Sequence, residues 1–304
     1  MKSKALIGGI IALIIIALAI AFCVWAGGKI NEKLSEINPS EPQTSEPNSP
    51  QTNDSQSVSQ GNLPFGNPSN AAPNTSNSDN YLMESKFYTL SYNREKGIAN
   101  WVAWRLSKSD FGSANRQNDF RPDDRLPGSW TRILPSDYSG SGFDRGHLCP
   151  SADRSNSVES NSATFLMTNI SPQTPDLNQG AWEKLETYSR SMARRDGNLF
   201  IIAGNYGNRR ERVKSKITIP TNFWKIIVVI PPGADASAIN KDTRIIAVDM
   251  PNVSGIKEKN WRDYKTTVRQ IEQKTGYDFF SNLPKDLQNA LETKIDDRQS
   301  FLQR

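Results

Sequence analysis

Among its 304 residues the chain has a single histidine, His147, in the run Gly142-Phe-Asp-Arg-Gly-His-Leu-Cys-Pro150. Imidazole is the side chain that titrates nearest to neutral pH, so His147 is the natural candidate for a general base. Arg145 places a permanent cation beside it, and Gly146 leaves room for another group close to the backbone. A base and a cation are what an attack on a phosphodiester requires. The alternative is a histidine that serves only packing.

A second block of polar residues follows this motif. It comprises Thr168-Asn-Ile-Ser-Pro-Gln173 and then Asp176-Leu-Asn-Gln-Gly-Ala-Trp-Glu-Lys-Leu-Glu186. Together the two blocks resemble the DNA/RNA non-specific endonuclease family, whose members carry an Asp-Arg-Gly-His motif in a ββα-metal (His-Me finger) active site. The similarity covers roughly residues 86–295, and it includes the runs 100–105, 219–226 and 270–280.

The resemblance implies a role for each of several residues. His147 would be the general base, at the end of a strand that faces a metal-bearing helix, and Asn178 would be the metal ligand. Glu186 would hold a water bound to that metal. The remaining catalytic positions implied by the family are Arg116, which stabilises the pentacovalent phosphate, Arg190, which lies near the scissile group, and Asn169, which supports the site from a strand end.

Ordinary structural roles stay open for two of these residues. Asn178 suits the first turn of a helix as well as a metal site, because its side chain can cap backbone N–H groups. Glu186 stands four residues before Arg190, so the two side chains suit a solvated ion pair on a helix surface.

The role of the charged pair inside the motif is also open. Arg145 either contacts a phosphate, as a catalytic residue, or pairs internally with Asp144 or Asp153. For Asp144 itself, anchoring its own loop is the favoured interpretation. Gly146 is interpreted as permissive backbone geometry beside the base.

The type of metal follows from the ligands that the chain lacks. The sequence has no cluster of histidines, cysteines or carboxylates with zinc-ligand spacing. One or two protein oxygens with water suit a hard, highly hydrated ion. Mg²⁺ is therefore the expected cofactor, with Mn²⁺ as the alternative ion.

The pattern of apolar residues predicts an α+β fold. Short β-branched runs bounded by Gly, Pro or Asn predict strands, and apolar side chains at helical spacing predict helices. Because the order lacks regular βαβ alternation, we expect a mainly antiparallel sheet packed with helices. The predicted strands are 101–104, 165–170, 199–203, 226–230 and 245–248, and the predicted helices are 178–194, 261–274 and 284–291.

The N-terminal part of the chain differs in composition from the rest. Residues 5–28 carry no charge and are long enough to span a bilayer as a helix. We therefore expect residues 1–28 to form a signal anchor, that is, a transmembrane helix. Residues 29–80 are rich in Ser, Pro, Asn and Gln and predict a disordered linker. Residues 81–304 would form the endonuclease domain. Lysines before the span favour an outward-facing domain, and a cleaved export signal is the alternative.

The charge of the folded part fits a polyanionic partner. Residues 86–304 hold 33 of the 37 lysines and arginines but 25 of the 32 acids, an excess of eight positive charges. The two cysteines, Cys23 and Cys149, lie in unrelated parts of the chain, so we expect no disulfide and a packing role for Cys149.

Taken together, the sequence predicts a membrane-anchored, Mg²⁺-dependent endonuclease that hydrolyses DNA and RNA on the extracytoplasmic side of the cell membrane. The alternative is a surface protein of the same fold that binds or takes up nucleic acid with little catalysis. A homodimer and an inhibitor protein are left open as partners.

Overall fold

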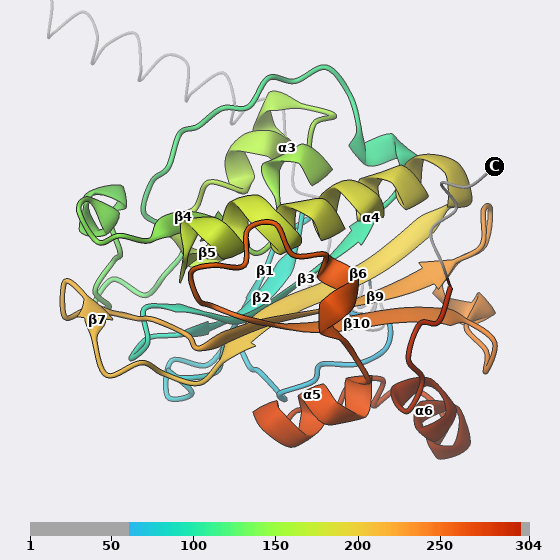
Figure 1. Ribbon diagram of the computed structural model, residues 1–304. Helices are drawn as coiled ribbons and strands as arrows, with labels where there is room; N and C mark the ends of the chain where they lie inside the picture. Colours follow the sequence, from blue (N-terminus) through green and yellow to red (C-terminus); the bar gives the residue numbers. More distant parts are fainter. Residues whose placement is uncertain (1–60, 299–304) are drawn as a thin grey trace, which may run out of the picture. The chain divides into compact units, whose positions relative to one another are not determined.

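Seven strands form the central sheet of the computed structural model, which describes residues 61–298 (Figure 1). Their order in the sheet is β1-β2-β3-β6-β9-β10-β11, and every neighbouring pair is antiparallel. The strands are β1 (Tyr81–Glu84), β2 (Thr89–Asn93), β3 (Ile98–Leu106), β6 (Asn198–Tyr206), β9 (Asn222–Ile230), β10 (Arg244–Pro251) and β11 (Lys265–Thr266).

Helices cover both faces of this sheet (Figure 1). On one face Trp104 and Ile227 pack with Leu185 and other apolar residues of α4 (Glu183–Asp196). On the opposite face the core includes residues of α5 (Val268–Thr275) and α6 (Lys285–Glu292). Because the central strands are covered on both sides, they read as nearly continuous apolar runs rather than alternating ones. The α+β fold with a mainly antiparallel sheet is confirmed.

The histidine motif forms a separate two-stranded ladder. The strand β4 (Asp144–His147) pairs antiparallel with β5 (Ile170–Gln173), and His147 ends its strand opposite Ile170. After β5 the chain makes a π-helical turn at Leu177–Trp182 and continues directly into α4. Strand, strand and helix thus follow one another in the predicted order.

The turn into the helix depends on Gly180. Its φ of −113° and ψ of −117° are not helical. A Cβ at this position would lie 2.7 Å from the backbone oxygen of Lys257, so only glycine lets the two segments approach this closely. The other short elements are α3 (Val158–Ala163), β7 (Arg212–Val213), β8 (Ile217–Thr218) and single 3₁₀ turns at Lys108–Asp110, Pro135–Tyr138, Ser151–Asp153, Met167–Asn169, Ala236–Ala238 and Trp261–Tyr264.

Two of the predicted elements are wrong in place or type. The predicted strand at 165–170 is mostly a 3₁₀ turn, and β5 begins only at Ile170. The predicted helix at 261–274 begins only at Val268, because Lys265 and Thr266 pair with β10 and the Thr267 hydroxyl accepts a hydrogen bond from the Gln270 N–H. Apolar periodicity does not register such local side-chain bonds.

The folded region begins before the predicted boundary at Tyr81. Phe65 and Ala71 are buried, and Ala72 forms a β-bridge with Tyr81. Residues 61–80 therefore pack against the domain, and hydrogen bonds from Asn62 to the Ser85 carbonyl and from the Trp101 indole to Ser69 also hold them there. The predicted anchor at 1–28 and the linker up to residue 60 lie outside the described residues. Within residues 61–298 no helix is long and apolar enough to cross a bilayer.

The N-terminal segment should contribute measurably to stability. The ring of Phe65 packs edge-on against Phe200 and Phe280, with centroids 5.4 and 5.9 Å apart. We expect Phe65→Ala to lower the free energy of unfolding in urea by about 3 kcal/mol. The exposed Val158→Ala is the control, with an expected change below about 0.5 kcal/mol. Equal effects of the two substitutions would show that the segment does not belong to the domain.

Candidate active site

His147 is held by aromatic rings at the end of β4. Its ring lies 5.0 Å from that of Phe165, edge to face, and 5.4 Å from that of Phe120. The side chain is 9% exposed, and its Nε2 is buried without a hydrogen-bond partner in residues 61–298. No acceptor at Nε2 therefore fixes the tautomer of this imidazole within the described residues. Gly146, next to His147, leaves room for the Gln173 side chain of β5, since a Cβ there would lie 2.1 Å from it.

Burial and nearby charges keep this imidazole neutral. They lower the pKa of His147 to about 3, burial first and then the guanidiniums of Arg116 and Arg145. At neutral pH the ring therefore carries no proton on one nitrogen and can accept one. A histidine in this state has the form that a general base needs.

Both guanidiniums border one polar cavity of about 330 Å³ together with Asn178. Arg116 donates to Ser151 Oγ at 2.6 Å and lies 4.8 Å from the Phe165 ring, while Arg145 lies 4.2 Å from the Phe120 ring. In the described part of the chain neither has a carboxylate within 4 Å. The pairing of Arg145 with Asp144 or Asp153 is therefore wrong, and both charges face the cavity unneutralised.

Asp144 joins the histidine strand to the helix. Its Oδ2 accepts hydrogen bonds from the side-chain amides of Asn178 and Gln179, both at 2.9 Å. Asp144 therefore anchors the helix entrance rather than its own loop. Asn178 lies inside the π-helical turn, where its backbone N–H bonds to the Thr174 carbonyl, and its side chain caps no helix. With its NH₂ group held by Asp144, the Oδ1 of Asn178 is left as the oxygen available to a cation.

Glu186 lies in a buried group of charges between α4 and the sheet. Lys225 Nζ on β9 donates to its Oε1 at 3.4 Å, and Arg190 lies 3.9 Å from its Oε2. Its side chain is 12% exposed, so the solvated surface pair with Arg190 is wrong. Burial raises the pKa of Glu186 to about 7, although Lys225 and Arg190 both oppose this effect.

Lys225 is a residue that the sequence analysis missed. It is 1% exposed, on a strand whose other side chains are apolar except for Asn222 at its start, with its Nζ 4.1 Å from the Trp182 ring and 5.6 Å from that of Trp104. Within the described residues Glu186 is the one carboxylate in hydrogen-bonding reach of Lys225. A lysine inside a strongly apolar strand was the available signal, because a buried ammonium requires a carboxylate partner.

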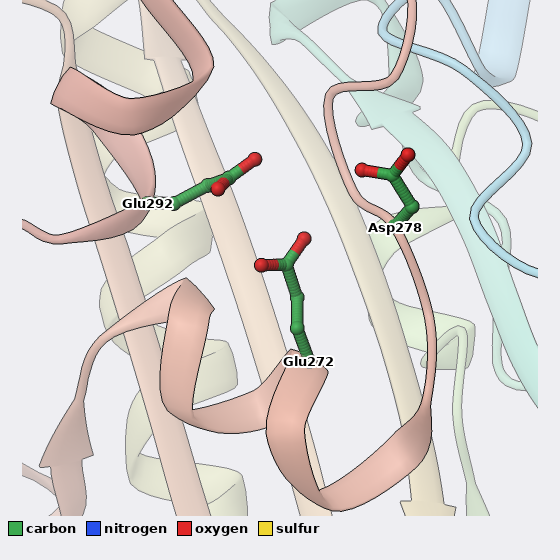
Figure 2. Close-up of side chains that lie close together, drawn as sticks. All are labelled: Glu272, Asp278 and Glu292. Carbon is green, nitrogen blue, oxygen red and sulfur yellow. The ribbon is translucent and has the colours of Figure 1, made fainter. Parts of the chain in front are cut away.

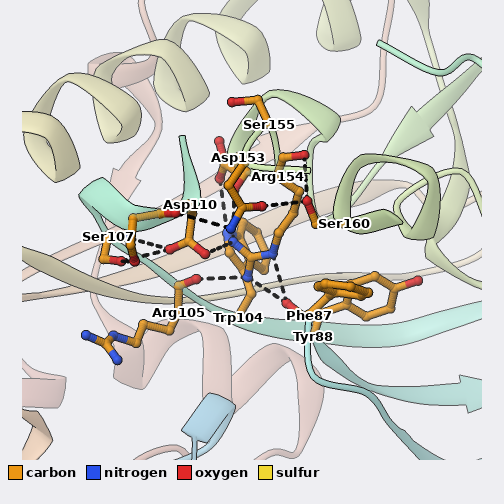
Figure 3. Close-up of polar contacts among 12 residues, drawn as sticks. Phe87, Tyr88, Trp104, Arg105, Ser107, Asp110, Asp153, Arg154, Ser155 and Ser160 are labelled. Atoms are coloured by element: carbon orange, nitrogen blue, oxygen red, sulfur yellow. Dashed lines mark hydrogen bonds and ion pairs between the residues drawn. The ribbon is translucent and has the colours of Figure 1, made fainter. Parts of the chain in front are cut away.

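Arg190 is committed to internal carboxylates. Its Nη1 lies 3.3 Å from Asp153 Oδ1, and Asp153 also accepts from the indole N–H of Trp104 at 3.0 Å. The residue after Asp153, Arg154, is buried and donates hydrogen bonds to the carbonyls of Phe87 and Arg105 (Figure 3). These bonds tie the segment after β4 to β3. These contacts make Arg190 a positioning residue, and its place near the scissile group, which the resemblance implies, stays a prediction.

Asn169 also has a structural role. It is fully buried, its Nδ2 donates to the carbonyls of Cys149 and Thr164 at 2.8 Å, and its Oδ1 accepts from the Cys149 N–H at 2.9 Å. No part of the amide is left to orient water, and Asn169 does not belong to a strand but to the 3₁₀ turn before β5. It fixes the segment that follows His147. Cys149 is buried and unpaired, as expected, and burial raises the pKa of its thiol.

A separate group of acidic side chains lies near α5 and α6. Carboxylate oxygens of Glu272, Asp278 and Glu292 come within 4.8 Å of one another and point toward a common space (Figure 2). Arg269 pairs with both glutamates. Burial raises the pKa of Glu272 to about 7, so protonation as well as Arg269 relieves the repulsion. This group lies on the sheet face opposite α4 and takes no part in the His147 site.

Comparisons with known proteins agree with this geometry. Residues 66–286 match the family model described as DNA/RNA non-specific endonuclease. A protein called "Nuclease" from Nostoc sp. (strain PCC 7120) is 49% identical over 235 residues, covering 77% of this chain and 85% of that protein. Human mitochondrial endonuclease G is 31% identical over 216 residues, covering 66% of this chain and 70% of that protein.

A solved structure shares the fold. It is that of the EndoG/EndoGI complex, with a TM-score of 0.63 and 22% sequence identity, covering 80% of this chain and 96% of that one. At the level of sequence, the protein called "Nuclease" from Serratia marcescens is 30% identical over 231 residues, or 72% of this chain and 82% of that protein.

Removal of the buried lysine should change the ionisation of Glu186. The Lys225 ammonium lowers the pKa of Glu186, so Lys225→Met should raise this pKa above 7, by about one unit. The measurement is the ¹³C chemical shift of the glutamate carboxyls against pH. The control is Lys184→Met. Lys184 is a half-buried lysine on α4, the helix that carries Glu186, and its ion pair is with the exposed Glu258. An unchanged Glu186 pKa in Lys225→Met would contradict the assigned ion pair.

Proposed function

The chain belongs to the DNA/RNA non-specific endonuclease family, and from this membership we propose that it cleaves both DNA and RNA in the cavity beside His147. It is thus a nuclease, a hydrolase of phosphodiester bonds. One observation carries the proposed site: a neutral imidazole packs against Phe120, which lines a cavity bordered by two guanidiniums without carboxylate partners and by the free oxygen of Asn178.

In this proposal His147 takes the proton of the attacking water. Arg116 and Arg145 attract the phosphate and stabilise the negative charge that develops on its oxygens. The same two cations lower the pKa of His147 in the free protein. A bound phosphate offsets their charge, which raises the basicity of the imidazole when the substrate is in place. Substrate binding and proton transfer are coupled in this way.

We further propose Mg²⁺, or Mn²⁺ in its place, as the cofactor. The donors fit a hard ion, because the Asn178 Oδ1 is left free by the bond from its NH₂ group to Asp144, and the cavity also contains the Asp144 carboxylate. Asn178 would be the protein ligand, and the ion would supply positive charge at the phosphate when bound. Glu186, whose charge acts on Arg116 of the cavity, would hold a water bound to the ion while Lys225 and Arg190 hold its carboxylate.

We also propose that residues 1–28 anchor the nuclease in the cell membrane with its folded domain outside the cytoplasm. The support is the uncharged stretch at residues 5–28 and the two lysines before it. An outward-facing domain fits an enzyme that would otherwise meet the nucleic acids of its own cytoplasm.

The nuclease assignment is tested with the purified full chain in detergent on plasmid, single-stranded DNA and RNA. We expect cleavage of all three with Mg²⁺, none with a chelator, and a rate lower by about 10²–10⁴-fold in His147→Ala. The control is Arg105→Ala, an exposed cation at the end of β3 that bonds to Asn198, which should cleave like the parent. Binding without cleavage by the parent would favour the nucleic-acid receptor instead.

The membrane topology is tested by adding protease to intact cells that produce the chain. We expect loss of the folded domain from the cell fraction without lysis, while a cytoplasmic marker protein stays intact. Protection until the cells are lysed would overturn the outward orientation. Release of the whole domain into the medium without protease would indicate a cleaved export signal.

A further inference from the structure

A strongly basic hairpin lies close to the proposed site. Residues 208–216, Asn-Arg-Arg-Glu-Arg-Val-Lys-Ser-Lys, contain five cations and one acid and include the strand β7 and its turn into β8. Four of the cations are exposed, and Arg209 is half-buried. Such a density of like charge repels itself, so its concentration in one hairpin points to an anionic partner.

Backbone carbonyls hold two of these cations in place. Arg209 donates to the carbonyl of Asn252 and lies 5.3 Å from the Phe143 ring, and Arg212 donates to the carbonyls of Glu95 and Lys216. A carbonyl fixes a guanidinium without cancelling its charge. Within the described chain only Lys216 of the five has an ion pair, with Asp137 at 3.1 Å.

The turn of the hairpin is equally well defined. Lys214 and Ser215 have φ values of 49° and 55°, and the Lys216 N–H bonds to the Val213 carbonyl at 3.0 Å. Two successive residues with positive φ closed by such a bond form a tight turn that suits the twist of a hairpin. The exposed Lys214 is therefore presented on a short, fixed turn.

The hairpin borders a hollow that continues toward the catalytic cavity. Arg209, Arg212 and Lys214 line a depression of about 380 Å³, and Phe143 lines both this depression and the cavity that contains Arg116 and Arg145. Phe143 immediately precedes Asp144 of β4. In Figure 1 the hairpin, labelled β7, lies at the same end of the sheet as β4 and β5.

We propose that the hairpin 208–216 is a second phosphate-binding surface, which holds the nucleic-acid strand at nucleotides beyond the scissile phosphate. This inference rests on the proposed function. The cations of the hairpin extend the positive charge beyond the cavity, so that one strand can contact both, and contacts to phosphate read neither base nor sugar. The hairpin thereby adds affinity for long substrates without adding sequence specificity.

The test uses binding of the full chain in chelator, where no cleavage interferes, to fluorescent single-stranded DNA of about 30 and of about four nucleotides. The double variant Arg210→Ala/Lys214→Ala removes two exposed cations of the hairpin whose side chains form no hydrogen bond or ion pair in the described structure. We expect its Kd for the long strand to rise about tenfold, and the slope of log Kd against log salt to fall by about 1.4. Its Kd for the short strand should stay unchanged.

The matched control is Lys241→Ala/Lys285→Ala, which removes two exposed lysines from the β9–β10 connection and from α6. An increase in Kd for the long strand no larger than in this control, or an equal increase for both strand lengths, would overturn the inference. Cleavage by the double variant with Mg²⁺ is measured in parallel. Parent protein that binds long strands through the hairpin but never cleaves them would refute the proposed function and leave the binding surface standing.

Discussion

The buried contact between Lys225 and Glu186 is the constraint on which the site depends. An ammonium inside an apolar sheet is costly unless a carboxylate meets it, so α4 must lie on the sheet with Glu186 above β9. Arg190 and Asp153 continue the same group of charges to the segment after β4. Removing Glu186 would leave Lys225 without a carboxylate in hydrogen-bonding reach within the described residues. The group therefore fixes the helix relative to both the sheet and the histidine strand.

The carboxylate of Asp144 connects the histidine strand to the start of the helix. Asp144 accepts hydrogen bonds from the side-chain amides of Asn178 and Gln179 at the start of the helix. These bonds hold Asn178 at the cavity that Arg116 and Arg145 border. The aromatic rings around His147 exclude water, and the two cations oppose a third positive charge. The two cations thus attract the phosphate and also add to the neutrality of the base, which burial causes first.

A recurring arrangement in the fold is a guanidinium held by backbone carbonyls. Arg154 binds the carbonyls of Phe87 and Arg105 in the interior, and Arg209 and Arg212 bind carbonyls at the surface. Inside the protein this arrangement satisfies buried acceptors and ties segments together. At the surface it fixes the position of a charge while leaving it available to an anion. The acidic group at α5 and α6 is different, because there Arg269 pairs directly with carboxylates.

The sequence by itself determined the chemistry and the class of fold. A single histidine, its Arg145 and Gly146 neighbours and the Asn178–Glu186 spacing identify the candidate site, and apolar runs identify most strands, because side-chain chemistry and periodicity are local properties. Only the tertiary structure decided what each charge contacts. It showed that the Asn169 amide is fully hydrogen-bonded to the backbone and that Arg190 is paired with carboxylates. It also showed that Glu186 is paired with Lys225, 39 residues away in the sequence. Such contacts join segments distant in the chain, and no local pattern specifies which buried charges meet.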